Sequence, residues 1–339
     1  MTTLGMLGVG NWGKNLLRDF AQMPDVRIAA VCDREPKRLK AWERICPGAR
    51  LTGEPSVIFG DPSIEAVVIA TPAVMHYELA KAALEAGKHV FVEKPLTLKV
   101  EHAVELIELA RRAGRVLMVG HLLRYHPAIA KLRGMIDAGE LGEVYYIYTQ
   151  RVNLGSIRSD ENALWSFAPH DISVILYLLG GLPDRVSARG ECYIQPGIED
   201  VVFVTMHFAD RKMANIHLSW LDPHKMRKFT IVGSKKMVTF DDMEPTEKIR
   251  IYDKGFSKGY DSYGDWITLR FGDITIPRID MAEPLKLECQ HFLECVRTGK
   301  EPVTNGEDGL RVLRVLDAAQ RSLDQGGVPV ELSAAGVSG

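Results

Sequence analysis

The chain has 339 residues, of which 46% are apolar and 25% are charged, and its formal net charge at pH 7 is -2. This length is enough for two domains that each bury a core of their own. The nearly balanced charge argues against a general electrostatic attraction to nucleic acid or to an anionic membrane, so we expect neither as a partner.

The cysteines and the apolar runs narrow the class of protein further. Five scattered cysteines show neither the spacing of metal ligands nor an even disulfide framework, which predicts reduced thiols and no bound metal. No apolar run approaches the roughly 20 residues that span a bilayer. The first expected strand begins at Thr2, which leaves no room for a signal peptide. We therefore expect a cytoplasmic protein.

Short apolar strands alternate with amphipathic helices over the first third of the chain. The expected strands are 2–7, 26–32, 66–70, 89–92 and 116–119, and the expected helices are 12–23, 35–44, 76–86 and 100–113. Unbroken apolar strands joined by helices indicate a parallel sheet that is covered on both faces. The prediction for residues 1–122 is therefore a doubly wound, Rossmann-like α/β domain.

The pattern changes after Gly120, where strands follow one another with little helix between them. Helices are expected at 127–138, 165–179, 284–298 and 307–325, and strands at 144–152, 201–208, 214–220, 229–232, 236–240 and 249–252. Short polar turns between consecutive strands predict a large, mostly antiparallel, open-faced sheet. Residues 123–333 are thus expected to form an α+β domain for substrate binding and oligomer formation, whose C-terminal helix could pack back on the first domain.

A glycine-rich turn follows the first strand. Gly8, Gly10 and Gly13 match the dinucleotide fingerprint in its required place between a strand and a helix, and Asn11 and Trp12 complete the turn. The first glycine permits the tight turn, the second lets the backbone approach a pyrophosphate, and the third lets helix and strand pack closely. The N–H groups at the start of the helix can then bind phosphate.

Asp33 ends the next expected strand, about 20 residues after the last glycine, where a carboxylate can accept a hydrogen bond from a ribose 2′-hydroxyl. Because that carboxylate would repel a 2′-phosphate, we expect NAD rather than NADP. Arg34 and Arg38 leave the alternative open, since either could pair with the phosphate or simply be solvated.

Ligands of doubly wound sheets bind beyond the carboxyl ends of the strands. Three expected strand ends carry candidate residues: Thr71 and Pro72 with His76, Glu93 and Lys94, and His121. The amine of Lys94 could hydrogen-bond a reacting oxygen and carry its proton. Glu93 could tether Lys94, touch the nicotinamide ribose or cap the following helix.

These motifs carry a resemblance to a known family. The fingerprint, Ala70-Thr71-Pro72 with His76, Glu93-Lys94-Pro95 and the antiparallel domain are similar to the glucose-fructose oxidoreductase/inositol dehydrogenase (Gfo/Idh/MocA) family over nearly the whole chain. The resemblance implies an NAD(P)-dependent dehydrogenase that transfers hydride between nicotinamide and a hydroxyl carbon of a sugar or cyclitol. It also implies a homo-oligomer, a dimer or a tetramer.

The family's lysine works with a histidine, and often an aspartate, near the start of a helix in the second domain. His170 matches that histidine, so the resemblance makes Lys94 and His170 the catalytic pair. The chain departs from the family at Ser166 and Ser173, where many members carry aspartate. Asp171 follows His170, but successive helical residues diverge by roughly 100°, so it need not face the same site.

The substrate side is less distinct. Residues 151–162 form a polar stretch before His170, and residues 224–228 gather positive charge that could bind phosphates or belong to a solvated hairpin. Besides Lys94 and His170, the candidate substrate residues are Arg124, Arg151, Asn153, Arg158 and Trp165.

The stretch 162–173 is similar to nucleotide-sugar members of the family, which oxidise C3 of UDP-N-acetylglucosamine or of its uronic acid. A free sugar or myo-inositol is the alternative substrate, and an NAD-binding regulator without catalysis is the alternative function, since fold alone does not establish catalysis.

Overall fold

The computed structural model describes residues 1–155, 157–261 and 264–332. The chain divides into two compact units, the first made of Met1–Tyr125 with Ala282–Leu313, the second of His126–Met281 with the chain from Arg314 onward. The expected division at residues 122 and 123 falls near the first of these breaks. Residues 282–313 belong to the first unit, and the second break, at residue 313, falls inside the C-terminal helix that was expected at 307–325.

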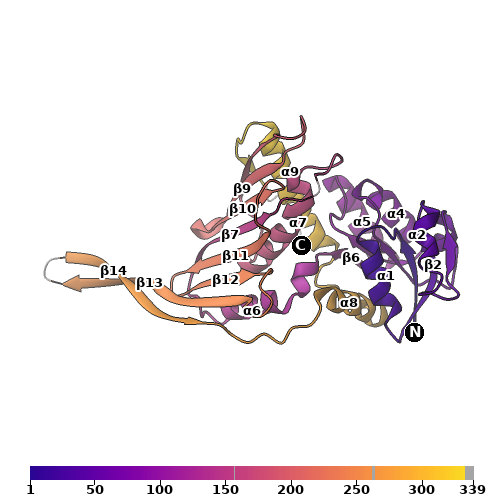
Figure 1. Ribbon diagram of the computed structural model, residues 1–339, viewed down its shortest axis with the longest axis horizontal. Helices are drawn as coiled ribbons and strands as arrows, with labels where there is room; N and C mark the ends of the chain where they lie inside the picture. Colours follow the sequence, from indigo (N-terminus) through magenta and orange to yellow (C-terminus); the bar gives the residue numbers. More distant parts are fainter. Residues whose placement is uncertain (156, 262–263, 333–339) are drawn as a thin grey trace. The chain divides into compact units, whose positions relative to one another are not determined.

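The first unit is built on a six-stranded sheet whose order, β3-β2-β1-β4-β5-β6, is that of a dinucleotide-binding domain (Figure 1). All of its pairings are parallel, as the alternating strands and helices predicted. Its strands are β1 (Thr2–Leu7), β2 (Val26–Cys32), β3 (Arg50–Thr52), β4 (Ala66–Ile69), β5 (His89–Glu93) and β6 (Leu117–Gly120). Its helices are α1 (Gly13–Ala21), α2 (Pro36–Lys40), α3 (Ser56–Phe59), α4 (His76–Glu85), α5 (Val100–Ala113), α8 (Pro284–Thr298) and the start of α9 (Gly306–Asp324), with 3₁₀ turns η1 (Ala73–Met75) and η2 (Leu122–Tyr125).

Helix α8 is part of the core of this unit although it lies far along the chain. Phe292 of α8 makes edge-to-face contacts with Phe20 of α1 and Phe91 of β5, at ring-centroid distances of 6.3 and 5.6 Å. Phe20 and Phe91 make the same kind of contact with each other at 6.5 Å. Edge-to-face pairs of buried rings stabilise a core beyond the area that they bury, so α8 completes the unit.

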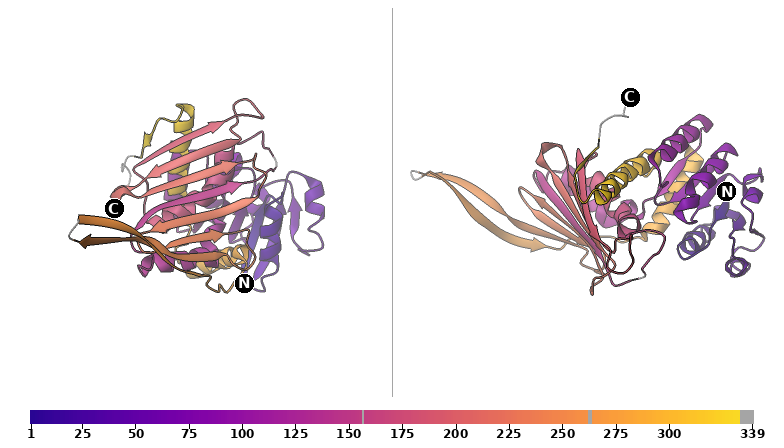
Figure 2. Two further views of the ribbon diagram at one scale, coloured as in Figure 1. Left: turned by 60° about the vertical axis from the view of Figure 1, so that its left-hand side comes forward. Right: turned by 90° about the horizontal axis from the view of Figure 1, so that it is seen from above.

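The second unit is built on a nine-stranded sheet of order β14-β13-β12-β11-β7-β10-β9-β8-β15 (Figure 2). Its pairings among the described residues are antiparallel except for β7 with β10, which confirms the mostly antiparallel prediction. Helix α7 packs on β7, β9 and β10, and the opposite face carries no helix of the second unit in the described chain (Figure 2). The strands are β7 (Val144–Val152), β8 (Arg185–Glu191), β9 (Val201–His207), β10 (Met213–Ser219), β11 (Met226–Gly233), β12 (Met237–Asp241), β13 (Ile249–Asp261), β14 (Gly264–Thr275) and β15 (Val330–Glu331), and the helices are α6 (Pro127–Asp137) and α7 (Ala163–Leu179), with a 3₁₀ turn η3 (Ala209–Arg211).

The strands at one edge of this sheet are longer than the sequence predicted. The expected strand 249–252 is only the beginning of β13, which pairs with β14 in a long two-stranded ribbon that extends beyond the other strands (Figure 1). Glycines and polar residues interrupt the apolar alternation there, and these residues are poor strand formers by themselves. The ribbon nevertheless exposes large apolar side chains, such as Phe256 and Phe271.

No helix in the described part of the chain is long and apolar enough to cross a membrane. Within residues 1–155, 157–261 and 264–332 no cluster of three or more His, Cys, Asp or Glu side chains is arranged to hold a metal ion.

Candidate active site

The glycine-rich turn has the shape that its sequence predicted. Gly8 adopts a φ of +85°, and a Cβ at this position would lie 2.7 Å from the carbonyl oxygen of Ala70. A side chain at Gly13, where α1 begins, would overlap the carbonyl oxygen of Gly8. The backbone is thereby bared at the N-terminus of α1, where N–H groups and the helix dipole favour phosphate. The turn therefore fits the pyrophosphate of a dinucleotide.

The Asp33 carboxylate at the carboxyl end of β2 holds this turn in place. Its Oδ2 accepts a hydrogen bond from the Val9 N–H at 2.9 Å, and its Oδ1 accepts one from the Glu35 N–H at 2.9 Å. The Arg38 guanidinium lies 3.7 Å from Asp33 and 2.9 Å from Glu35, whereas Arg34 is exposed. Arg38 is thus paired with two carboxylates, so the net charge of this group of three side chains is negative. A negative charge here favours a ribose 2′-hydroxyl over a 2′-phosphate.

Glu93 connects the cofactor turn to the proposed catalytic lysine. The indole Nε1 of Trp12 donates to Oε1 of Glu93 at 2.5 Å, and the Lys94 N–H donates to Oε2 at 3.2 Å. A Cβ on Gly120 would lie 3.0 Å from the same carboxyl group, which packs against the end of β6. Glu93 therefore joins the backbone of Lys94 to the indole of Trp12, and its role toward the Lys94 side chain stays a prediction. Burial raises the pKa of Glu93 to about 7, against the Trp12 hydrogen bond and the Lys94 charge, which lower it.

His76 supports the two loops beside this carboxylate. Its Nδ1 lies 2.8 Å from the carbonyl oxygen of Pro95 and its Nε2 lies 2.9 Å from that of Thr71. The ring is buried, which lowers its pKa despite these carbonyl groups. Both nitrogens face the protein's own backbone, so His76 links the Thr71-Pro72 loop to the Lys94 loop. Direct contact of His76 with a cofactor stays a prediction.

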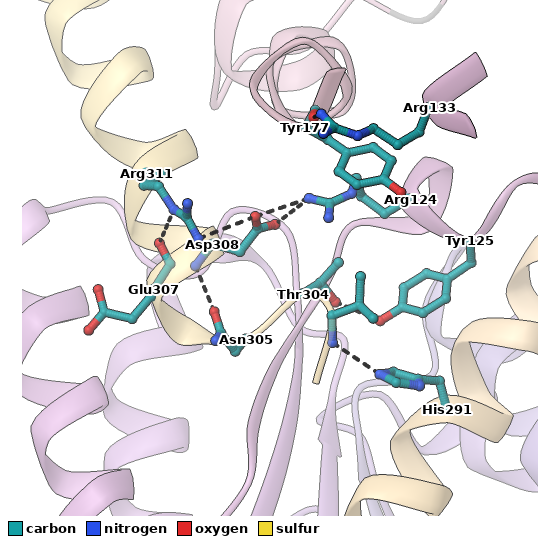
Figure 3. A network of polar contacts seen from close by, with 11 residues as sticks. Arg124, Tyr125, Arg133, Tyr177, His291, Thr304, Asn305, Glu307, Asp308 and Arg311 are labelled. Atoms are coloured by element: carbon teal, nitrogen blue, oxygen red, sulfur yellow. Dashed lines mark hydrogen bonds and ion pairs between the residues drawn. The ribbon is translucent and has the colours of Figure 1, made fainter. Parts of the chain in front are cut away.

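Two further polar residues follow β6. His121 is 1% exposed, and neither ring nitrogen has a hydrogen-bond partner among the described residues. Burial lowers its pKa to about 4, so the imidazole is neutral near pH 7. Arg124, a candidate substrate residue, instead donates through Nη1 to both carboxylate oxygens of Asp308 at 3.0 Å (Figure 3). Its side chain is 6% exposed, so this ion pair belongs largely to the interior of the unit.

Helix α7 carries His170 in the second unit. Its N-cap Asn162 accepts from the Trp165 N–H at 3.1 Å, and the Trp165 indole donates to Gln320 at 3.0 Å. Asp171 faces the sheet, where both of its oxygens accept from Arg151 at 2.8 and 3.0 Å. Both members of that pair are buried, so Arg151 serves the packing of α7 on β7, and its predicted contact with substrate is not tested.

Ser166 and His170 lie four residues apart and therefore on one face of α7. Ser166 also lines a cavity of about 460 Å³. The lining residues are Asn153, Leu154, Arg158, Ser166, Phe167, Trp220, Pro223, Lys225 and Arg227. The structure thus brings two candidate substrate residues, Asn153 and Arg158, to one cavity, whereas Arg151, Trp165 and His170 are not part of its wall.

Phe167, Lys225 and Arg227 also line the cavity, although none of them is a predicted site residue. The signal available for the last two was the basic stretch 224–228, for which a solvated hairpin was the alternative. Arg227 instead lies within β11 and is partly buried. Lys94 and His170 belong to different units, and their convergence on one substrate remains a prediction.

Both halves of the chain match domains of one protein family. Residues 2–121 match the oxidoreductase family with an NAD-binding Rossmann fold, and residues 129–239 match the Gfo/Idh/MocA C-terminal domain. An NAD(+)-dependent scyllo-inositol 2-dehydrogenase of Bacillus subtilis is 29% identical over 343 residues, which cover 96% of this chain and 95% of that protein.

Solved structures share the whole fold. A putative oxidoreductase from Magnetospirillum magnetotacticum has a TM-score of 0.81 at 29% identity and covers 94% of this chain and 99% of its own. A UDP-N-acetylglucosamine 3-dehydrogenase from Acidithiobacillus ferrooxidans has a TM-score of 0.80 at 25% identity, covering 96% and 98%. With the bared glycine turn, Asp33 and the sheet order, these matches show that the chain belongs to the Gfo/Idh/MocA family of NAD-binding oxidoreductases.

Proposed function

We propose that the protein oxidises a secondary hydroxyl of its substrate, with Lys94 Nζ taking the hydroxyl proton and His170 orienting the hydroxyl. NAD, which the Gly8–Gly13 turn and Asp33 would hold, would supply the hydride acceptor for the same carbon. The observation that carries the proposal is the connection from the fingerprint turn through Trp12 and Glu93 to Lys94. It fixes the backbone of Lys94 at the carboxyl edge of the sheet, where ligands of such sheets bind.

The substrate that we favour is a UDP-N-acetylhexosamine, either UDP-N-acetylglucosamine or its uronic acid, oxidised at C3. Three observations support it: the likeness of the stretch 162–173 to nucleotide-sugar members, the solved 3-dehydrogenase at 25% identity, and the polar cavity beside Ser166. A free cyclitol or sugar is the second candidate, because the Bacillus subtilis relative is an inositol dehydrogenase at 29% identity.

Substrate assays separate the two candidates. The purified protein is incubated with NAD and, in turn, UDP-N-acetylglucosamine, its uronic acid, scyllo-inositol, myo-inositol and glucose, and NADH formation is followed by absorbance. We expect reduction of NAD with a UDP-sugar. Turnover confined to inositols or free sugars would replace the nucleotide-sugar proposal, and no turnover with any of them would reject both.

Replacing Lys94 tests the chemistry itself. Lys94→Met should lower kcat by about 100-fold or more while the Kd for NAD changes little, because a general acid–base group contributes roughly this much to the rate. Lys99→Met, at the exposed start of α5, is the control and should leave kcat unchanged. Near-normal turnover of Lys94→Met would refute the assignment.

We also propose that the uncovered face of the nine-stranded sheet binds a second copy of the chain. The pairing register lines up six apolar side chains across neighbouring strands of that face. They are Ile274, Tyr252, Met237, Val232, Tyr146 and Met213. Tyr146 and Met213 are each 42% exposed, which is a large apolar surface for a monomer to leave in water. Tyr146→Lys with Met213→Lys should lower the molar mass measured by light scattering, and an unchanged mass would contradict this interface.

A further inference from the structure

The guanidinium of Arg227 is a partly buried cation that contacts only neutral groups. Its Nη1 donates to the carbonyl oxygens of Val152 at 3.1 Å and Met226 at 2.8 Å, and its Nη2 donates to Oδ1 of Asn153 at 2.7 Å. The Phe167 ring covers one side, with its centroid 5.1 Å from the guanidinium carbon. These contacts fix the orientation of the cation, and none of them supplies a negative charge.

The carboxylates nearest to Arg227 are held by other cations. Asp171 is bonded through both oxygens to Arg151, and Asp242 lies 3.8 Å from the ammonium of Lys248. Among the described residues, no carboxylate lies within ion-pair distance of Arg227. Burial and the neighbouring charge of Arg151 accordingly lower the pKa of Arg227 to about 10. Burying a charged group without a counter-charge costs stability. A bound anion would supply the missing counter-charge of Arg227.

The cavity beside Arg227 is suited to such an anion. Two further cations, Arg158 and Lys225, line the same space of about 460 Å³, and none of the described residues in its wall is acidic. Arg158 shares its charge with Glu161 at 2.8 Å, and Lys225 is exposed. Arg227 is therefore the inner cation, and its planar fork suits the paired oxygens of a carboxylate or a phosphate.

We propose that this cavity is an anion-binding subsite for the substrate, with Arg227 as its inner ligand and Lys225 and Arg158 at its mouth. The bound group is an oxyanion, either a phosphate of a nucleotide diphosphate or the carboxylate of a uronic sugar. The assignment of this anion to the substrate rests on the proposed function, because Ser166 in the cavity wall shares a helix face with His170. The subsite then selects charged sugar derivatives over neutral polyols.

Binding measurements on the full-length, NAD-loaded protein test the subsite without relying on turnover. Calorimetric titrations with inorganic pyrophosphate and with D-glucuronate represent the two sources of the anion, and glucose is the neutral counterpart of the sugar. We expect one or both anions to bind and glucose to bind more weakly than glucuronate. Pyrophosphate binding alone would assign the site to phosphates, and glucuronate binding alone would assign it to a sugar carboxylate.

Two variants test the role of Arg227 by different routes. Arg227→Gln removes the charge and should weaken anion binding about 10- to 100-fold, the usual range for loss of a charged hydrogen-bond partner. Ser166→Asp leaves Arg227 in place but adds a carboxylate to the cavity wall, and should weaken binding similarly. Arg250→Gln, which removes an arginine paired with Glu247 on the same sheet, is the control and should bind like the wild type. Thermal unfolding verifies that each variant is folded.

The outcomes separate the subsite from the proposed function. Binding of neither anion by the wild type, or equal binding by Arg227→Gln in its folded form, overturns the subsite. Arg227-dependent binding without oxidation of any UDP-sugar supports the subsite and rejects the nucleotide-sugar function. Oxidation of UDP-N-acetylglucosamine with the same KM in the wild type and in Arg227→Gln supports the nucleotide-sugar function and rejects the subsite.

Discussion

The hydrogen bond from the Trp12 indole to Glu93 should influence the protonation state of the carboxyl group that accepts from the Lys94 N–H. Burial raises the pKa of Glu93 to about 7, and the Trp12 bond at 2.5 Å opposes that rise. In Trp12→Phe the aromatic ring remains but the donor is lost. A hydrogen bond to a charged group contributes about 1.5–3 kcal/mol, and one pKa unit corresponds to about 1.4 kcal/mol. The pKa of Glu93 should therefore rise by about one to two units in the variant.

The titration can be followed directly at the carboxyl carbon. Protein labelled with ¹³C at glutamate carboxyls is titrated by NMR, and Glu93→Gln assigns the Glu93 signal by its disappearance. Trp165→Phe is the control, because it removes an indole bond to the neutral amide of Gln320. A Glu93 midpoint that is the same in Trp12→Phe as in the wild type would show that the indole does not stabilise the carboxylate.

The same shift has a consequence for stability. A carboxyl group whose pKa is raised on folding binds more protons in the native state, so the free energy of unfolding falls as pH rises through the window between the unfolded and folded pKa values. For Glu93 this window runs from the ordinary glutamate pKa of 4.5 to a pKa of about 7. Urea unfolding should therefore show a loss of stability across this range that is smaller in Glu93→Gln, where the buried Glu288 still contributes, and that extends to higher pH in Trp12→Phe.

Three further substitutions test neighbouring contacts. Gly120→Ala places a methyl group 3.0 Å from the Glu93 carboxyl, so it should cost about 1–3 kcal/mol in urea unfolding and lower kcat; unchanged values would contradict the packing. Arg124→Met leaves the partly buried Asp308 with only the more distant Arg311, at 3.9 Å, as a cationic neighbour, so it should cost up to about 3 kcal/mol, part of which Arg124→Met with Asp308→Asn should restore; a smaller loss in the single variant than in the double would refute the pair. Asp33→Asn removes the charge that faces a ribose, so calorimetry should show a smaller preference for NAD over NADP, and an unchanged ratio would locate cofactor selection elsewhere.

Much of the fold follows from local patterns. Strands β1, β2 and β7 and helices α5 and α8 begin and end at the predicted residues, because continuous apolar runs and helical periods are strong there. The short β3 and α3 were missed, since three or four residues carry too little pattern. The register of the β13–β14 ribbon was missed as well, because it depends on pairing between strands rather than on either strand alone.

In the candidate site, too, local features could be predicted from the sequence and long-range contacts could not. The glycine turn and Asp33 were readable because their geometry is local to one strand–turn–helix segment. The hydrogen bond from Trp12 to Glu93 joins residues 81 positions apart. The pairing of β5 with β6 places Gly120, which has no side chain, beside Glu93, and the sequence does not show this pairing. The partner of Arg151 could not be predicted for a related reason: Asp171 is supplied by a helix that packs against the strand, and the predicted contact of Arg151 with substrate stays a prediction.

The contact of Phe292 with Phe20 and Phe91 has a consequence for the biogenesis of the protein. The cofactor-binding unit starts at the first residue, yet the ribosome must translate the intervening 126–281 before α8 is available to cover those two rings. A nascent chain that stops short of α8 would leave an apolar surface open to water and to chaperones. A minimal NAD-binding fragment should therefore join residues 1–125 to 282–313 through a short linker rather than end at residue 125.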